Sequence, residues 1–209
     1  MIVDCGGYMV NLTTRKLRIG EITEISGDCC GSTFVDKEFI KFLRKKLGTH
    51  AIDLLIETHY VQFQYMIQEF CRHLKIPFTG DDPNFLYEMD LEEVCPILLR
   101  YVRGEAKEKL KDDEGLIKFD YNTIKSMFDP VVGKIIHLIN LQLSRTQEAC
   151  EAIFLVGGFS ENKYLQKRIK KEFHNRVRTI LVPVPITAIA SGAVIYGVDL
   201  CKIIHSAVI

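Results

Sequence analysis

Three features that this sequence lacks limit the classes of protein to which the chain can belong. Its 27 basic and 27 acidic side chains give a net charge of zero. The chain therefore has no excess of positive charge that would attract nucleic acid or an anionic membrane surface. No apolar run reaches membrane-spanning length. The seven cysteines include no Cys-x-x-Cys pair, and no secretory leader is recognisable, which favours reduced thiols over a disulfide framework or a structural zinc site. We therefore expect a cytoplasmic protein that binds neither nucleic acid nor membrane.

The chain does have the length and apolar content that a folded core requires. It contains 209 residues, of which 47% are hydrophobic and 26% are charged, the balance of a globular protein. This length suffices for one larger domain or two small ones.

The stretch around which we expect the fold to be organised is Glu151–Ser160, with the sequence E-A-I-F-L-V-G-G-F-S. The unbroken apolar run Ala152–Val156 predicts a buried strand, and it ends at Gly157 and Gly158. A helix capped by Ser160 is predicted to follow. Its predicted buried positions are Leu165, Ile169 and Phe173. This arrangement places bare backbone at the carboxyl end of a strand, where open α/β sheets bind ligands. Taken alone, the motif favours tight strand-to-helix packing.

The beginning of the chain predicts a second glycine corner. The predicted strands of an antiparallel meander are Ile2–Asp4, Met9–Thr13 and Leu17–Ile25. Asp4 is followed closely by Gly6 and Gly7, whose backbone N–H groups can face a phosphate while the carboxylate holds a hydrated Mg²⁺. The alternative is an aspartate that hydrogen-bonds its own turn.

An Asp-x-Gly-Gly hairpin followed about 150 residues later by a strand ending in Val-Gly-Gly resembles the second lobe of the actin-like ATPase superfamily. That superfamily includes DnaK-type heat-shock chaperones, actin and sugar kinases. Four blocks in order are more specific: they resemble divergent ATPases of the heat-shock protein 70 family, of the heat shock protein family A member twelve type. The blocks are G-S-T-F-V-D-K-E-F from Gly31, F-D-P-V-V-G-K-I-I from Phe128, L-V-G-G-F-S-E-N-K-Y-L-Q from Leu155 and A-I-A-S-G-A from Ala188.

The resemblance implies an α/β fold made of a ribonuclease-H-like layer with an inserted, mostly helical subdomain. Residues 1–50 and 121–209 would form the layer, corresponding to subdomain IIA, and residues 51–120 the insert, corresponding to subdomain IIB. Within the layer, Asp129 and Pro130 predict the first turn of a helix. Arg178–Val182 predicts a strand, and Ile186–Val198 a final helix rich in small residues.

The resemblance also implies a binding site for ATP or ADP with Mg²⁺. Asp4 would position Mg²⁺ through water, with no direct protein ligand to the metal. The implied nucleotide contacts are Gly6, Gly7, Tyr8, Gly31, Glu69, Arg72, His73, Gly157, Gly158 and Phe159. Within this set, Glu69 would accept from ribose hydroxyls and Arg72 would stack on the base, while His73 stands where the family has a second cation. The alternative for Glu69, Arg72 and His73 is a solvated charged helix face.

Departures from the family pattern weaken the expected hydrolytic activity. Tyr8 adds bulk where backbone should approach phosphate, Met9 replaces a threonine hydroxyl, and Asn11 replaces a second aspartate. No first-lobe hairpin is recognisable. We therefore expect an ATP-binding lobe of a heat-shock-chaperone-like ATPase that is incomplete and weak or inactive alone, with a first-lobe polypeptide or a client protein as partner. The alternative is a protein-interaction scaffold that keeps the fold without nucleotide.

Overall fold

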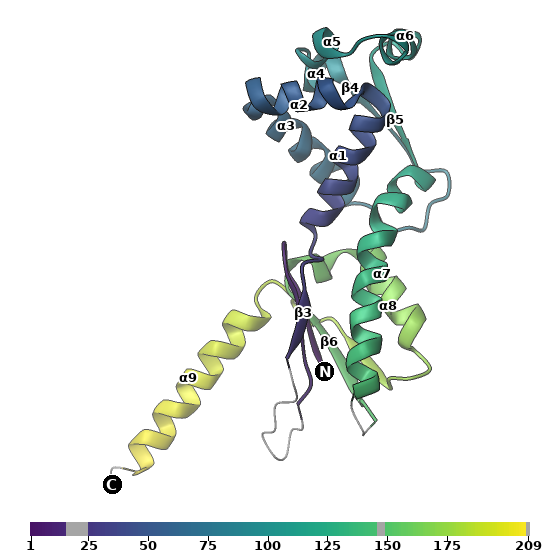
Figure 1. Ribbon diagram of the computed structural model, residues 1–209. Helices are drawn as coiled ribbons and strands as arrows, with labels where there is room; N and C mark the ends of the chain where they lie inside the picture. The colour runs from purple at the N-terminus through teal and green to yellow at the C-terminus, as the bar shows by residue number, and fades with distance from the viewer. Residues whose placement is uncertain (16–24, 146–148, 208–209) are drawn as a thin grey trace. The chain divides into compact units, whose positions relative to one another are not determined.

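The structure, a computed structural model, describes residues 1–15, 25–145 and 149–207. It divides into two compact units (Figure 1). Unit 1 comprises Met1–Ser32 and Lys134–Ile209, and unit 2 comprises Thr33–Gly133. The insert boundaries near residues 50 and 121 stay a prediction. Most of the predicted strand Leu17–Ile25 lies outside the described residues.

Unit 1 is built on a five-stranded mixed sheet with the order β3-β2-β1-β6-β7. The strands are β1 (Ile2–Cys5), β2 (Val10–Thr13), β3 (Ser26–Asp28), β6 (Ala152–Val156) and β7 (Thr179–Leu181). The first three pair antiparallel, whereas β6 runs parallel to both β1 and β7. Sequence analysis predicted the strand before Gly157 with its observed bounds. A mixed α/β unit is thus present, and its sheet is compatible with a ribonuclease-H-like layer.

Helices cover one face of this sheet (Figure 1). They are α8 (Lys163–Phe173), which follows the short 3-10 helix η2 (Gly158–Glu161), and the part of α7 (Tyr121–Arg145) that belongs to unit 1. The predicted apolar positions of α8 are all buried: Leu165, Ile169 and Phe173. The predicted cap was wrong. Asn162 accepts a hydrogen bond from the N–H of Leu165 at 3.0 Å, while the Ser160 hydroxyl donates to the Val156 carbonyl at 2.7 Å.

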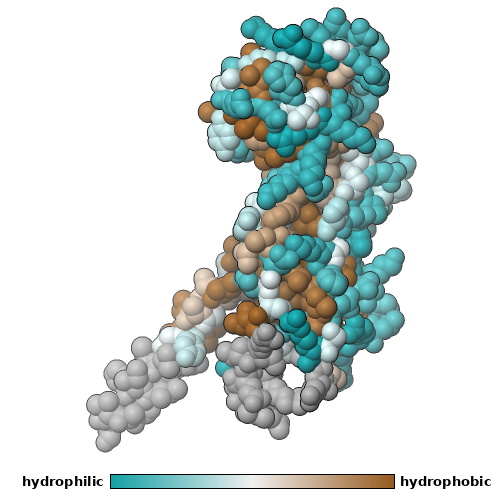
Figure 2. Space-filling model, in the orientation of Figure 1, coloured by the Kyte–Doolittle hydropathy of each residue, from teal (hydrophilic) through white to brown (hydrophobic). Residues whose placement is uncertain are grey.

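Apolar side chains also remain exposed on the strands of unit 1. The register places Ile2 beside Phe154, and Phe154 beside Leu181, so the three form a row across β1, β6 and β7. Their exposed fractions are 43%, 39% and 44%. The last helix, α9 (Ala188–Ala207), likewise exposes Ile195 and Tyr196, and Figure 2 shows apolar side chains on its N-terminal part. No helix within the described residues is both long enough and apolar enough to span a membrane.

Unit 2 is mostly helical. Its helices are α1 (Thr33–Leu47), α2 (Thr49–Thr58), α3 (Tyr60–Phe70), the π-helical turn η1 (Cys71–Lys75), α4 (Leu91–Val94), α5 (Leu98–Tyr101) and α6 (Glu105–Asp112), with the N-terminal part of α7. An antiparallel hairpin of β4 (Leu86–Asp90) and β5 (Leu116–Asp120) completes the unit. Phe39 and Phe70 stack in its core with ring centroids 4.1 Å apart.

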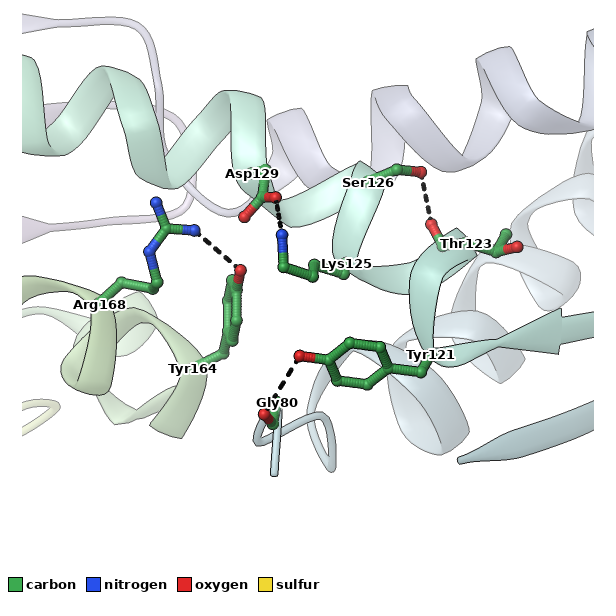
Figure 3. Close-up of polar contacts among 8 residues, drawn as sticks. All are labelled: Gly80, Tyr121, Thr123, Lys125, Ser126, Asp129, Tyr164 and Arg168. Carbon is green, nitrogen blue, oxygen red and sulfur yellow. Dashed lines mark hydrogen bonds and ion pairs between the residues drawn. The ribbon is translucent and has the colours of Figure 1, made fainter. Parts of the chain in front are cut away.

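The start of α7 corrects a sequence-based prediction. The helix begins at Tyr121, not at Asp129 and Pro130. Asp120 caps it by accepting from the N–H of Thr123 at 2.7 Å, and hydrogen bonds from Thr123 lower the pKa of this carboxyl. Asp129 lies inside the helix and pairs with Lys125 one turn earlier, as Figure 3 shows. Pro130 is therefore an internal helix residue.

Candidate functional site

Two glycine turns meet at one edge of the sheet of unit 1. β1 and β6 run parallel with Asp4 opposite Val156, so the turns that follow both strands leave the sheet at the same edge. We call this group the glycine corner. It consists of Asp4, Gly6, Gly7, Gly31, Gly157 and Gly158. The two turns, both of which the resemblance assigns to one nucleotide, thus lie at one edge of the sheet.

Gly157 must be glycine for packing reasons. Its φ of +82° lies in the left-handed region, and a Cβ there would be 2.3 Å from Asp4 Oδ1 and 2.6 Å from the Cys5 carbonyl oxygen. Its N–H donates to the Pro185 carbonyl at 3.1 Å. The residue therefore allows the end of β6 to approach the end of β1 closely.

Gly31 has the same role on the other side of the corner. A Cβ there would be 2.4 Å from the Gly7 carbonyl oxygen and 2.5 Å from that of Gly6. Its N–H donates to the Tyr8 carbonyl at 2.9 Å, and the N–H of Ser32 donates to the Gly6 carbonyl at 3.1 Å. These bonds fasten the segment after β3 to the turn between β1 and β2.

The glycines of the corner thus fall into two groups. The N–H groups of Gly6, Gly31 and Gly157 donate to protein carbonyls, because the backbone segments approach one another closely. The expectation that the Gly6 N–H faces a phosphate is corrected by its 3.0 Å bond to the Met9 carbonyl. In contrast, a Cβ on Gly7 or Gly158 would meet no atom within 4 Å. Among the glycines of the corner, these two therefore have open space at the Cβ position.

Asp4 is the acidic group of the glycine corner. It is half-buried and lies on β1, the strand between β2 and β6. Within the described ranges 1–15, 25–145 and 149–207, no residue forms an ion pair or hydrogen bond with its carboxylate. The same ranges contain no cluster of three or more His, Cys, Asp or Glu that could hold a metal ion. Asp4 can therefore accept hydrogen bonds from ordered water, including the water shell of a cation.

The turn between β1 and β2 carries bulky side chains beside the open glycines. Tyr8 is 56% exposed, and a hydrogen bond with Cys29 raises the pKa of its phenol. The Cys29 thiol lies 3.4 Å from the Met9 sulfur. Phe159, by contrast, is buried, with 5% of its surface exposed. The predicted contact of Phe159 with a ligand stays a prediction.

The second predicted group lies in unit 2, at the junction of α3 and η1. Glu69 is 8% exposed, and both of its carboxylate oxygens are engaged. Arg72 Nη1 lies 3.1 Å from Oε1, and His73 Nε2 lies 3.2 Å from Oε2. Arg72 itself is largely exposed. The alternative of a solvated helix face is therefore wrong for Glu69, which is a buried carboxylate with two partners.

The π-helical turn that carries Arg72 and His73 is anchored to α1. Lys75 binds Asp36 at 2.7 Å, with exposed side-chain fractions of 12% and 17%. The Cys71 thiol also donates to Asp36, at 3.5 Å, and burial raises the pKa of Cys71 to about 11. Such π-helical turns inside helices occur frequently at functional sites.

Sequence analysis missed one residue of this second group. Tyr87 of β4 stacks on the His73 ring, with centroids 5.5 Å apart and an angle of 11° between the planes. Burial, and then the nearby Glu69 and Glu93, raise the pKa of its phenol. The alternation in L-Y-E-M-D could have indicated the strand, but no sequence signal pairs it with His73. The glycine corner and the Glu69 group thus form two clusters in different units.

Comparisons with known proteins find distant relatives over most of the chain. Human heat shock 70 kDa protein 12A is 27% identical over 213 aligned positions, which cover 95% of this chain and 32% of that protein. Human heat shock 70 kDa protein 12B is 24% identical, covering 94% of this chain and 31% of that protein. The chain spans about a third of the length of these relatives, and no model of a protein family matches it. The chain is thus a distant homologue of the heat shock 70 kDa proteins 12A and 12B.

Proposed function

We propose that this chain is the nucleotide-binding lobe of a heat-shock-70-like ATPase and that it binds ATP or ADP with Mg²⁺. The observation that carries the proposal is the glycine corner, where Gly7 and Gly158 have open space and the half-buried Asp4 carboxylate has no ion-pair or hydrogen-bond partner among the described residues. The names of the distant relatives support a nucleotide ligand. Glycine-rich turns at the carboxyl ends of strands are the usual place for phosphate binding in α/β sheets.

The residues of the corner fit a hydrated Mg²⁺ held indirectly. Asp4 supplies a single carboxylate, and Mg²⁺ usually keeps several waters when it accompanies nucleotide phosphates. When bound, the ion would neutralise phosphate charge. Asp4 would orient one or two of its waters, and Gly158 would admit the phosphates close to the backbone.

Hydrolysis by this chain alone is proposed to be weak or absent. Asn11 lies opposite Asp4 in the strand register, so an amide stands where a second carboxylate would act. Met9 offers no hydroxyl, and the exposed Tyr8 adds bulk beside Gly7. Phosphoryl transfer depends on positioned polar groups around the phosphates, and these substitutions remove them. We propose that a first-lobe polypeptide completes the phosphate site.

Taken by itself, the Glu69 group of unit 2 is a proposed contact for adenosine. Glu69 already binds Arg72 and His73, yet each carboxylate oxygen has a second lone pair that can accept from a ribose hydroxyl. His73 presents a flat ring in a fixed orientation. We retain residues 51–120 as the proposed inserted subdomain.

Calorimetric titration with ATP and Mg²⁺ tests the proposal. We expect binding by the wild-type chain and its loss in Gly158→Val, because the side chain enters the open space and its Cβ meets no protein atom within 4 Å. Gly192→Val is the matched control, since its added Cβ also meets no atom within 4 Å but lies on α9. No binding heat from a folded wild-type chain would contradict the proposal, as would equal binding by both variants.

A second candidate function is a protein-interaction scaffold that does not use nucleotide. The observation that favours it is the apolar row of Ile2, Phe154 and Leu181 together with the exposed apolar side chains of α9. Exposed apolar patches mark protein-interaction surfaces. This function predicts no ATP binding in the same titration.

A further inference from the structure

The stack of Tyr87 on His73 connects two elements of unit 2. Tyr87 belongs to β4 and His73 to η1, and their nearly parallel rings lie 5.5 Å apart. Nearly parallel rings at this separation form a favourable stacked arrangement. The stack therefore fixes the plane of the His73 imidazole relative to the strand.

A second contact fixes the same ring at its edge. His73 Nε2 lies 3.2 Å from Glu69 Oε2, and Glu69 is held in turn by Arg72 at 3.1 Å. The His73 side chain nevertheless keeps 41% of its surface exposed. The imidazole is thus oriented by a ring on one face and by a carboxylate at its edge, and it still presents surface to a ligand.

We infer that Tyr87 is a positioning residue for nucleoside binding: it holds the His73 ring as a flat platform on which the base of an adenine nucleoside stacks. The inference rests on the proposed function. The part of the ligand that this group recognises is a planar aromatic base. A stacked ring attracts a flat base, whereas it offers a phosphate chain no favourable contact. Glu69 and Arg72 keep the edge of the platform polar, next to the ribose.

The test compares three ligands on four forms of the full chain. Wild type, Tyr87→Leu, Tyr87→Phe and Tyr60→Leu are titrated with ATP and Mg²⁺, with adenosine and with inorganic triphosphate. We expect Tyr87→Leu to weaken ATP and adenosine by roughly three- to tenfold, the range for one lost aromatic pair, and to leave triphosphate unchanged. Tyr87→Phe retains the ring and should match wild type. Tyr60→Leu removes an exposed tyrosine of α3 outside the stack and is the matched control.

A readout without ligand follows the His73 ring itself. In nuclear magnetic resonance spectra, Tyr87→Leu should move the ring-proton resonances of His73, because the ring current of Tyr87 is lost, and Tyr87→Phe should restore them. Intact far-ultraviolet circular dichroism would show that the variant has folded.

The outcomes separate the inference from the proposed function. If wild type binds none of the three ligands, the proposed function fails, and the inference fails with it. If wild type binds ATP and Tyr87→Leu binds ATP and adenosine equally well, the inference alone is overturned. An equal loss for triphosphate and adenosine would also overturn it, because Tyr87 would then support the fold and not the base.

Discussion

Glycine residues in the candidate site serve two different physical needs. Gly31 and Gly157 sit where two backbone segments approach so closely that a Cβ would overlap a carbonyl or carboxylate oxygen. Gly7 and Gly158 have room for a side chain, so the packing of the protein does not require glycine at either position. The distinction cannot be drawn from the sequence, where Gly157 and Gly158 are simply adjacent.

Alanine substitutions at the adjacent pair should therefore differ in their effect on stability. We expect Gly157→Ala to lower the free energy of unfolding by about 2 kcal/mol or more, because it combines a left-handed φ with overlap against Asp4 and Cys5. Gly158→Ala should change it by less than about 0.5 kcal/mol. Urea unfolding followed by circular dichroism measures both. Equal losses would contradict the close approach at Gly157.

At the scale of elements, α7 contains a residue that a helix interior disfavours. Pro130 has no N–H to donate to the carbonyl of Ser126, four residues earlier, and its ring crowds the same turn. The helix nevertheless extends from Tyr121 to Arg145, because the Asp120 cap and a long apolar stripe support it. The buried residues of that stripe include Ile124, Phe128, Val132, Ile135 and Ile139.

Replacing this proline should stabilise the protein. We expect Pro130→Ala to raise the free energy of unfolding by about 1 to 3 kcal/mol, since it restores a backbone hydrogen bond and a residue of high helix propensity. Thermal and urea unfolding measure the change. Pro130→Gly is the control, because it restores the N–H but has poor helix propensity, and its gain should be smaller. A loss of stability in Pro130→Ala would show that the helix needs the proline.

The sequence predicted some elements well and others poorly for identifiable reasons. The bounds of the strand Ala152–Val156 and the buried positions of the helix after it were predicted correctly, whereas the predicted burial of the strand on both faces was wrong for Phe154. The start of α7 was predicted wrongly because Asp129-Pro130 is a typical pair at the first turn of a helix. The observed N-cap is Asp120, the last residue of β5. β4 was missed because only Met89 of its five residues is buried.

At the scale of the whole molecule, both units have their own buried cores, but unit 1 keeps apolar surface exposed. The row of Ile2, Phe154 and Leu181 crosses three adjacent strands. Sequence alone could not predict that row, because Phe154 belongs to an apolar run that predicted burial on both faces. The meeting of the two glycine turns was predictable, since parallel strands end at the same edge of a sheet.

Such a surface should make the chain self-associate. We expect sedimentation velocity to show oligomers whose share rises with protein concentration, and Phe154→Glu to reduce them by placing a charge within the row. Val61→Glu is the matched control, because Val61 is 82% exposed on α3 in the other unit. A wild-type chain that stays a uniform monomer at high concentration would contradict the prediction.

The two kinds of glycine also determine how other sequences of this type can be interpreted. A descendant that had abandoned nucleotides would still need Gly31 and Gly157, since losing either would damage the fold itself. Their survival is therefore no sign of a retained ligand. The packing places no such constraint on Gly7 and Gly158. If the proposed function holds, the replacement of these two glycines in a sequence that keeps Gly31 and Gly157 would indicate that nucleotide binding has been lost and the fold retained.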